Sequence, residues 1–353
     1  MGIFIIAYTA LIAAKFISLN DNRNNKKAYC IILGMIYFLI ASLRGRCVGG
    51  DTDIYVNAFQ YLSTVSYKGA ANFMGKDPVF YIFISFIGKI WCNYTFLFTI
   101  IAFIFTVSVT NFIYKFSDDP FLSWAFMLAF NLYQFTLTAM RQTIAISFVL
   151  FAFSYLLENK WFKGVILTLI ASLFHMSALC VLVIFVFYKV KINKQILYSS
   201  LLVLAFVYLL KSRIAMLFLS VFKEENREYA VENKGAGMTM LLVITILYVA
   251  CTVLIDKEKL NQSPVLQKLF IISFFALIFE ILVPAQSIFF RFAFYYLFGM
   301  AALLPNMINN CIVKEKKAVY AVLFFILSVQ YIFFTMGSCY ITPYYTFWQD
   351  RPI

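Results

Sequence analysis

Ten long apolar runs divide this chain, and they restrict its fold more than any other feature. They cover residues 2–18, 28–43, 94–114, 121–138, 142–157, 195–211, 239–255, 264–283, 291–310 and 318–336. A helix needs about 20 residues to cross a hydrocarbon core of about 30 Å, so the shorter runs must include flanking residues. With 63% hydrophobic and 13% charged residues, the composition excludes a soluble protein. We therefore expect an all-α polytopic membrane protein, folded as a single integral membrane domain over residues 1–353.

Two further stretches can be assigned in two ways. Polar side chains recur every four positions along one face of residues 78–92, which favours an interfacial amphipathic helix over a crossing one. Residues 164–188 are apolar except at three positions that include His175. They form either one long span or a hairpin of two short spans with its tip at His175. In the first alternative, residues 78–92 lie flat in the interface and residues 164–188 form the hairpin. In the second, residues 78–92 cross the membrane and residues 164–188 form one long span. Each alternative gives about 12 transmembrane helices.

The two alternatives place Arg141 on opposite sides of the membrane. The hairpin alternative puts Arg141 outside and brings Lys115, Lys160 and Lys163 into the cytoplasm, where later lysines also lie. It obeys the positive-inside rule better, and we favour it. Both ends of the chain are then outside.

Arginines and lysines are sorted to opposite sides in this arrangement. Seven of the eight arginines fall in outer segments: Arg44, Arg46, Arg141, Arg213, Arg227, Arg291 and Arg351. Lysine commonly anchors cytoplasmic loops, whereas the planar arginine fork binds phosphate at two points. The sorting predicts a phosphate-bearing substrate at the outer face. It also accounts for the net charge of +13 without a nucleic-acid partner.

The first outer loop gathers charge beside glycine. Arg44 and Arg46 are followed by two glycines and then by Asp51, Asp53 and Tyr55. Glycines allow close approach of a ligand, arginines bind an anion, and a carboxylate acts as a base or orients a hydroxyl. The alternative is a tight turn with a surface salt bridge. Without histidines or further carboxylates nearby, we assign no metal to the aspartates.

Two later breaks between apolar runs carry ionisable side chains. Arg141 and Gln142 lie between two runs, where a guanidinium is costly unless it is paired or meets water. His175 is the only histidine of the chain and, as a neutral imidazole, could accept a proton from an attacking hydroxyl. The alternatives are a snorkelling arginine and a hydrogen-bonded core histidine.

A third candidate region surrounds the break before residue 291. Glu280 lies near the outer end of its run, and Arg291 begins the next run among aromatic side chains that include Tyr295. Aromatic rings there suit sugar stacking as well as an interfacial belt. Alternatively, Glu280 and Arg291 pair with each other and are structural.

The order and spacing of five blocks resemble the EpsG family, the Wzy-type polymerases of bacterial surface polysaccharides. The blocks are Arg46-Cys-Val-Gly49-Gly50-Asp51-Thr-Asp53-Ile-Tyr55, Asp77-Pro78-Val-Phe-Tyr81, Met140-Arg141-Gln142-Thr-Ile-Ala145, Ala171-Ser-Leu-Phe-His175-Met-Ser177 and Phe290-Arg291-Phe. Together they span roughly residues 40–300. Gly50 departs from the family pattern, in which a small hydroxyl residue is common.

The resemblance implies a GT-C-like glycosyltransferase at the outer face of the cytoplasmic membrane, with its active site facing the periplasm or cell exterior. It would transfer a growing glycan from undecaprenyl diphosphate to another lipid-linked repeat unit, with inversion and without metal or cofactor. Arg141 and Arg291 would stabilise the leaving diphosphate, and His175 or Asp51 would act as base. Arg44, Arg46, Asp53, Tyr55, Gln142, Glu280 and Tyr295 would contact substrate.

Other functions remain open at this stage. A flippase for the same lipid-linked sugar, a glycosyl- or acyltransferase that decorates the polymer, and a structural subunit of the assembly complex are alternatives. The expected partners are the lipid-linked oligosaccharide, the bilayer and, for polymer assembly, a chain-length regulator and a flippase. The outer loop at 212–238 ends in two glycines, so it serves either as a lid or as a solvated surface helix.

Overall fold

The computed structural model describes residues 2–17, 23–221, 237–337, 341 and 343–349, and these residues are almost entirely helical. Contacts divide the chain into two compact units. Unit 1 comprises residues 1–154, 162–179 and 323–353, and unit 2 comprises residues 155–161 and 180–322. The single membrane domain expected from the sequence stays a prediction.

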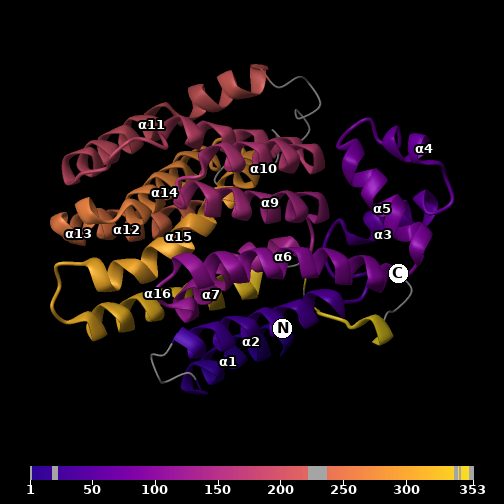
Figure 1. Ribbon diagram of the computed structural model, residues 1–353, viewed down its shortest axis with the longest axis horizontal. Coiled ribbons are helices and arrows are strands. Elements are labelled where there is room, and N and C mark those ends of the chain that lie inside the picture. The colour runs from indigo at the N-terminus through magenta and orange to yellow at the C-terminus, as the bar shows by residue number, and fades with distance from the viewer. Residues whose placement is uncertain (1, 18–22, 222–236, 338–340, 342, 350–353) are drawn as a thin grey trace. The chain divides into compact units, whose positions relative to one another are not determined.

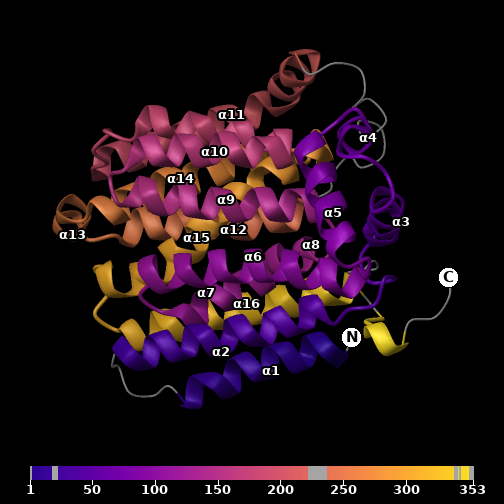
Figure 2. The ribbon, with the colours of Figure 1, turned by 45° about the vertical axis from the view of Figure 1, so that its right-hand side comes forward.

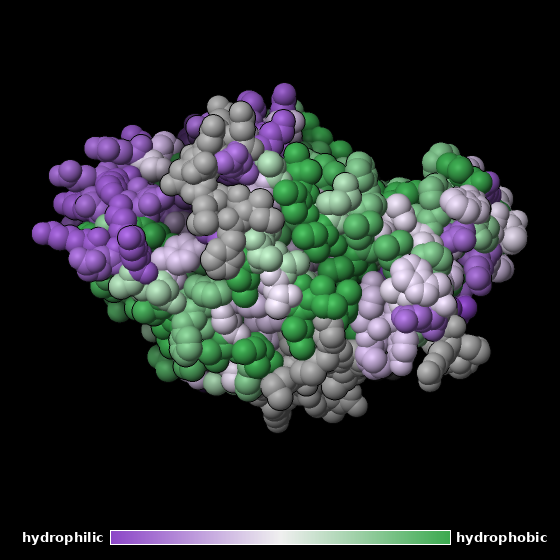
Figure 3. Space-filling model, turned by 90° about the horizontal axis from the view of Figure 1, so that it is seen from below, coloured by the Kyte–Doolittle hydropathy of each residue, from purple (hydrophilic) through white to green (hydrophobic). Residues whose placement is uncertain are grey.

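Six helices in the described part of the chain are long and apolar enough to cross a membrane. They are Tyr94–Phe116, Met140–Leu157, Lys194–Phe218, Pro264–Leu282, Ser287–Asn310 and Lys316–Phe334. Shorter apolar helices accompany them. Figure 3 shows that many of the side chains at the surface are hydrophobic. The prediction of an all-α, multi-pass membrane protein is confirmed, whereas the number of about 12 spans and the GT-C-like fold stay predictions.

Unit 1 is built mainly from the first ten helices (Figure 1). Its helices are α1 (Gly2–Ile17), α2 (Arg23–Ser42), α3 (Thr52–Leu62), α4 (Tyr67–Ala71), α5 (Pro78–Ile90), α6 (Tyr94–Phe116), α7 (Pro120–Ala129), α8 (Leu132–Thr136), most of α9 (Met140–Leu157) and most of α10 (Trp161–Phe174). The later part of α16 (Lys316–Gly337) and the short 3-10 helix η5 (Phe347–Gln349) complete it.

The core of unit 1 forms where α2, α6 and α7 run side by side (Figures 1 and 2). Tyr37 of α2 stacks on Trp124 of α7 with ring centroids 4.5 Å apart, and Tyr133 Oη donates to the Tyr37 carbonyl at 2.7 Å. Gly34 lies so close to Thr110 that an added Cβ would sit 2.6 Å from its hydroxyl. Large stacked rings and one glycine contact therefore hold these helices together.

The apolar run 121–138 does not form one helix, contrary to expectation. Helix α7 ends at Ala129, and Asn131 adopts a left-handed conformation with φ of 61° before α8 begins. Asparagine tolerates this conformation, and the Gln134 amide donates to the Leu128 carbonyl at 3.1 Å across the break. Irregular backbone survives at membrane depth only when protein buries it. Both flanking helices are almost completely buried, so this break satisfies that condition.

Helix α5 lies across the direction of α2 and α6 rather than along it (Figure 2). With 13 residues it is about 20 Å long, which is too short to cross a bilayer. One face packs on α3 and α4, while Phe86, Ile90 and Trp91 remain exposed. This geometry suits a helix in the interface, and that location stays a prediction for residues 78–92.

Residues 161–188 form a hairpin. Helix α10 ends at Phe174, and the 3-10 helix η1 (Met176–Phe187) begins one residue after His175. The rings of Trp161 and Tyr188, at the start and the end of this stretch, stack with centroids 5.1 Å apart. The chain therefore reverses between them, and His175 lies at the turn.

Unit 2 is centred on two antiparallel helices, α14 and α15. Its elements are most of η1, α11 (Lys194–Val221), α12 (Met238–Leu254), α13 (Lys257–Gln262), α14 (Pro264–Leu282), η4 (Ser287–Phe289), α15 (Phe290–Asn310) and the start of α16. Gly299 of α15 meets Ile272 of α14 so closely that an added Cβ would fall 2.2 Å from Ile272 Cγ2. Of the expected outer loop at 212–238, α11 occupies the beginning, and residues 222–236, including Arg227, lie outside the described residues, as does Arg351.

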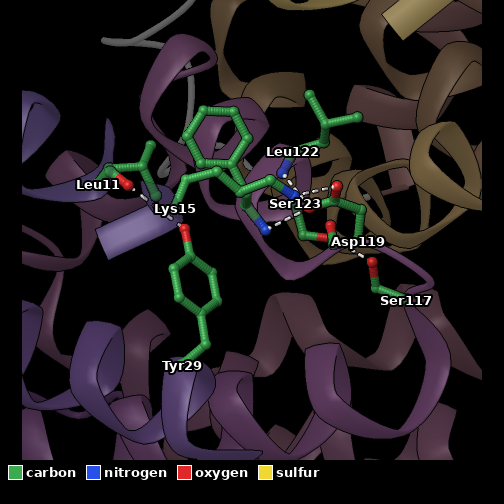
Figure 4. A network of polar contacts seen from close by, with 8 residues as sticks. Leu11, Lys15, Tyr29, Ser117, Asp119, Leu122 and Ser123 are labelled. Atoms are coloured by element: carbon green, nitrogen blue, oxygen red, sulfur yellow. Dashed lines mark hydrogen bonds and ion pairs between the residues drawn. The ribbon is translucent and has the colours of Figure 1, made fainter. Parts of the chain in front are cut away.

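Several lysines lie at the opposite end of their unit from a neighbouring arginine. In unit 1, Lys15 pairs with Asp119 at 2.8 Å (Figure 4). Lys26, in the first turn of α2, donates to the Ser117 carbonyl at 2.6 Å, whereas Arg44 follows the other end of α2. In unit 2, Lys194, Lys259 and Lys268 bond to backbone carbonyls at one end, and Arg291 lies at the other end of α15. These residues follow the sorting seen in the sequence, and the side of the membrane on which each end lies stays a prediction.

A candidate active site at Asp77

The site is built around Asp77, which precedes the first proline of α5. Three helices begin with a proline that follows an aspartate or a serine: Asp77-Pro78, Asp119-Pro120 and Ser263-Pro264. Asp119 and Ser263 cap their own helices with side-chain oxygens, as such residues usually do. Asp77 does not cap α5, and it adopts a left-handed conformation with φ of 48° and ψ of 52°. This costly geometry turns its carboxylate away from its own helix.

Arg141 binds the carboxylate that Asp77 turns outward. Its Nη1 lies 2.9 Å from Asp77 Oδ2, and its Nε donates to the Tyr55 hydroxyl at 3.1 Å. Arg141 lies in the first turn of α9, whereas Tyr55 lies on α3 and packs edge-on against Phe80 of α5. Three helices thus fix the orientation of one guanidinium. Its Nη2 carries no hydrogen bond among the described residues, so that part of the fork can meet a ligand.

His175 binds the same carboxylate from the hairpin turn. Its Nδ1 lies 3.1 Å from Asp77 Oδ2, and the backbone N–H of Met176 donates to Asp77 Oδ1 at 3.2 Å. Next to an ionised carboxylate, Nδ1 carries the proton and Nε2 becomes the basic nitrogen. Asp77 therefore selects the tautomer of His175 in addition to anchoring Arg141.

The Asp77 carboxyl stays ionised at neutral pH. Burial alone raises the pKa of Asp77, but the hydrogen bond and charge of His175, the charge of Arg141 and the Met176 N–H outweigh burial and hold the pKa below its ordinary value. The Asp77 side chain is 8% exposed, that of His175 14% and that of Arg141 23%. The cluster is thus largely shielded from water but remains accessible on the arginine side.

Two charged residues of the first outer loop, Arg46 and Asp53, pair with each other. Arg46 pairs with Asp53 at the surface, with its Nε donating to Asp53 Oδ1 at 2.6 Å, and also bonds to Asn57. This part of the loop is therefore a turn with a surface salt bridge, which was the alternative to an anion-binding loop. Asp51 stands at the N-cap of α3 without capping it through its side chain, and no described contact joins it to Asp77.

Arg44 is buried rather than available at the surface. The residue is only 2% exposed. Its guanidinium carbon lies 4.1 Å from the centroid of the Phe98 ring, and its Nη1 donates to the Ala41 carbonyl at 2.6 Å. A strap of residues 343–349 covers this segment, because Arg44 and Thr346 form an antiparallel β-bridge. The Gly45 N–H donates to the Tyr345 carbonyl at 2.8 Å. The contacts of Arg44 are those of a structural anchor.

The backbone brings the loop and the Arg141 turn to the same end of unit 1. The Thr52 hydroxyl lies 3.2 Å from the Leu137 carbonyl, and Gly49, with φ of 107°, would clash with that carbonyl if it carried a Cβ. Gln142, next to Arg141, is buried at 2% exposure. Arg141 therefore lies at the end that holds Arg44 and Arg46, as the hairpin alternative requires.

The remaining candidates belong to unit 2. Glu280 is 1% exposed, and neither of its carboxyl oxygens has a hydrogen-bond partner among the described residues, so it does not pair with Arg291 here. Arg291 is partly exposed and lies 5.9 Å from the centroid of the Phe290 ring. Tyr295 is fully buried in α15.

Sequence reasoning named Arg141, His175 and Tyr55 but missed Asp77, which joins them. Asp77 appeared there only as one polar position of an amphipathic helix and as part of a family-like block. The available signal was the Asp-Pro pair, but the same pair at Asp119 caps a helix. For a metal, the described residues contain no group of three or more His, Cys, Asp or Glu side chains that could hold one.

Comparison with known proteins identifies the family. The EpsG family model matches residues 27–347 of the 353-residue chain, which includes all residues of the Asp77 cluster. Comparisons with curated proteins and with solved structures give no match. Because the match covers most of the chain, this protein belongs to the EpsG family.

Proposed function

We propose that this protein polymerises a bacterial surface polysaccharide at the outer face of the cytoplasmic membrane. It transfers a growing glycan from undecaprenyl diphosphate to the sugar end of another lipid-linked repeat unit. Membership of the EpsG family supports the reaction class. The observation that carries the proposal is the Asp77 carboxylate, which holds Arg141 and His175 together, because glycosyl transfer from a diphosphate needs both a cation and a base.

Arg141 supplies the cation in this scheme. When the bond between the anomeric carbon and the diphosphate breaks, negative charge grows on the phosphate oxygens. A guanidinium already held by Asp77 and Tyr55 needs no reorganisation to meet this charge. In a site that excludes water, such a donor contributes roughly 3 kcal/mol to the transition state. We expect activity to survive metal chelation, because the guanidinium provides the charge that a metal would otherwise provide.

His175 acts as the base. The acceptor sugar hydroxyl gives its proton to Nε2 as its oxygen attacks the anomeric carbon from the side opposite the diphosphate, which inverts that centre. Asp77 keeps the proton on Nδ1 and stabilises the imidazolium that forms. The contact with Asp77 at 3.1 Å supports His175 over Asp51 as base, since no described contact joins the Asp51 side chain to Asp77, Arg141 or His175.

The apolar helices suit a lipid-linked substrate. The polyprenyl chain would remain in the bilayer beside exposed apolar side chains, while the diphosphate and sugars project to the end where Asp77 lies. Arg291 of unit 2 is a second candidate for binding a phosphate, and the variant Arg291→Ala tests it. The bilayer, a chain-length regulator and a flippase are proposed partners of the same process.

The test is deletion of the gene followed by complementation with wild type, Arg141→Ala, His175→Ala, Asp77→Asn or Arg291→Ala. The surface glycan ladder and the lipid-linked intermediates are measured together. A polymerase defect gives single repeats that still reach the outer leaflet, and we expect this from the Asp77 cluster variants. Lys160→Ala is the matched control, because Lys160 forms an exposed pair with Glu158 at 2.7 Å outside the cluster.

Other outcomes would overturn the proposal. Repeats that stall on the inner leaflet would identify a flippase. A persistent ladder with altered sugars or acyl groups would identify a decorating enzyme.

A further inference from the structure

Arg44 has hydrogen-bonding capacity that its anchoring contacts do not use. Its Nη1 donates to the Ala41 carbonyl in the last turn of α2, and its guanidinium covers the Phe98 ring. Its Nε and Nη2 are buried and have no hydrogen-bond partner among the described residues. Leaving charged donors buried and unpaired costs free energy, so these two nitrogens gain from any acceptor that reaches them.

The two nitrogens form one edge of the guanidinium. Nε and Nη2 point the same way in the planar fork, and an edge of this kind binds two oxygens of a carboxylate or a phosphate. Arg46 shows the edge in use two positions later, because its Nε and Nη2 both donate to Asp53 Oδ1. The same edge of Arg44 has no carboxylate partner among the described residues.

The described surroundings of Arg44 contain no acid that balances its charge. The pKa of Arg44 falls to about 10 because the residue is buried, with Tyr133 and Tyr344 as smaller opposing influences. Arg44 therefore stays positively charged at neutral pH, whereas the two tyrosines are neutral. Both hydroxyls donate to backbone carbonyls, that of Tyr133 to Tyr37 and that of Tyr344 to Ile40. A buried cation in such surroundings fits an anionic ligand.

The strap of residues 343–349 pairs with residues 40–45 over Arg44. Three hydrogen bonds tie the two segments together: Gly45 N–H to the Tyr345 carbonyl at 2.8 Å, Phe347 N–H to the Leu43 carbonyl at 3.0 Å and the Tyr344 hydroxyl to the Ile40 carbonyl at 2.6 Å. Phe347 and Trp348 remain exposed. A short surface segment held in this way opens at a lower free energy than packed helices do. The strap can therefore leave Arg44 while α2 and α6 stay packed.

Arg44 also lies near the candidate active site. The Phe98 ring that it covers belongs to the same buried apolar cluster as Tyr55 and Met140. Tyr55 in turn accepts a hydrogen bond from Arg141. A phosphate group held by Arg44 would thus lie at the end of unit 1 that carries the Asp77 cluster.

We propose that Arg44 binds a phosphate group, and that the strap covers and uncovers this second phosphate-binding site. In the closed state described here, the strap pairs with residues 40–45. In the open state the strap has left, and Nε and Nη2 each bind one phosphate oxygen. Donor and acceptor of the proposed reaction both carry a lipid diphosphate, and the Asp77 cluster serves that of the donor. Assigning Arg44 to the diphosphate of the acceptor rests on the proposed function, whereas the site itself does not.

Hydrogen exchange of the strap tests the site in the full-length protein. The probe is inorganic pyrophosphate, and the protein is placed in nanodiscs of neutral phosphatidylcholine. Because pyrophosphate binds the open state, exchange in peptides that contain Gly45 or Phe347 should become at least threefold faster. Arg44→Gln should abolish this response, and Arg141→Ala should retain it, because Arg141 belongs to the other site. An unchanged exchange rate in the wild type would overturn the proposal.

Phenylglyoxal gives an independent measurement at the same side chain. It modifies guanidinium groups that solvent reaches, and peptide mass spectrometry locates the adduct. Labelling of Arg44 should be slow, and pyrophosphate should slow it further although the strap opens. The pyrophosphate concentration that gives half protection measures the affinity of this site alone. Labelling of Arg44 that speeds up with pyrophosphate would mean that the strap opens without a phosphate on Arg44, which contradicts the proposal.

Tyr344→Phe separates a covered binding site from a purely structural arginine. The variant keeps the ring but loses the hydroxyl that bonds to the Ile40 carbonyl, so the strap opens more often. The affinity of Arg44 for pyrophosphate should then rise about 3- to 10-fold, because the binding-competent fraction grows by the contribution of one hydrogen bond. Tyr198→Phe, on the exposed side of α11, is the matched control and should leave this affinity unchanged. An equal or weaker affinity in Tyr344→Phe would overturn the covered site.

Further arms identify the source of the phosphate and separate the possible failures. Nanodiscs with phosphatidylglycerol and no pyrophosphate show whether an ordinary lipid headgroup also opens the strap or whether a diphosphate is required, and both results support the site. Equal acceleration by sodium chloride at matched ionic strength would overturn it. An unresponsive strap in a chain that polymerises glycan overturns the site alone. A responsive strap in a chain that supports no polymerisation overturns the proposed function and leaves the site standing.

Discussion

Asp77 in unit 1 and Glu280 in unit 2 are both largely buried acids, yet their surroundings are opposite. Asp77 stands at a strained break before a short helix and binds Arg141, His175 and a backbone N–H. Glu280 lies within a regular helix, and the described residues provide its carboxyl oxygens with no partner. The comparison teaches that irregular backbone lets several helices converge on one charge. A regular helix does not turn a side chain towards other elements in this way.

Replacing Asp77 tests the partnered acid and should have the largest effect. Asp77→Asn removes the charge that orients His175 and balances Arg141, so the polymerisation rate should fall about 10²- to 10⁴-fold. The rate is measured with lipid-linked repeat units in membrane vesicles. Asp119→Asn is the matched control, because Asp119 also precedes a proline and also pairs with a cation. Equal losses in both variants would show that Asp77 matters only to folding.

Arg141→Lys separates charge from geometry in the same cluster. Lysine keeps the positive charge but loses the planar fork that bonds Asp77 and Tyr55 at once. We expect about a 100-fold drop in rate, with a normal amount of folded protein in the membrane. Arg213→Lys, on the exposed side of α11, should retain the wild-type rate. A full rate for Arg141→Lys would mean that only charge is needed at this position.

Gly299→Ala tests how firmly the Glu280 region is held. The new Cβ would meet Ile272 Cγ2 at 2.2 Å, so α14 and α15 must separate, and stability should fall by about 1–3 kcal/mol. Gly34→Ala in unit 1 should cost less, because the atom it meets is the Thr110 hydroxyl, which can rotate away. Thermal unfolding in detergent compares the two variants. A larger loss for Gly34→Ala would contradict the conclusion that α14 and α15 pack more closely than the helices at Gly34.

Acid should affect the two regions differently. The pKa of Asp77 is lowered by its partners from an ordinary value of 3.8, so its stabilisation is present above that value and is lost as pH falls through the lowered pKa. Glu280 has no partner among the described residues whose interaction protonation would break, so it gives no such loss. Melting temperatures measured between pH 7 and pH 3 should therefore drop more steeply below about pH 4 in wild type than in Asp77→Asn. Parallel curves would show that Asp77 is not the group responsible.

Glu280→Gln should have the smallest effect on stability. The amide replaces a carboxyl group whose oxygens have no hydrogen-bond partner among the described residues, so we expect a change below about 1 kcal/mol. Thermal unfolding at neutral pH measures it. A loss as large as that of Gly299→Ala would mean that Glu280 is ionised and paired in the resting protein, which would erase the contrast with Asp77.

Long apolar segments could be predicted from the sequence. The run 94–114 corresponds to α6 at Tyr94–Phe116, and the run 264–283 to α14 at Pro264–Leu282. The run 121–138 could not, because its break depends on Asn131 in a left-handed conformation and on a bond from Gln134. Apolar character alone does not distinguish a straight helix from a broken one whose break is buried.

The candidate site was predictable in part, for a related reason. His175 and Arg141 are conspicuous as ionisable residues at breaks between apolar runs. Asp77 is not, because Asp77-Pro78 and Asp119-Pro120 are alike in sequence, and only the tertiary structure decides which carboxylate caps its helix and which turns away. Likewise, the pairing of Arg46 with Asp53 and the burial of Arg44 follow from contacts that the composition of the loop does not encode.

The strap over Arg44 has a consequence for biosynthesis. Tyr344 bonds to the Ile40 carbonyl across 304 positions of sequence, and residue 346 bridges residue 44. A ribosome adds roughly 5–20 residues per second, so the first loop emerges many seconds before the segment that clamps it exists. During that interval the loop beside Tyr55 lacks its clamp, and a chain interrupted before the strap never acquires it. Maturation of this protein is therefore tied to late events of translation rather than to insertion of its early helices.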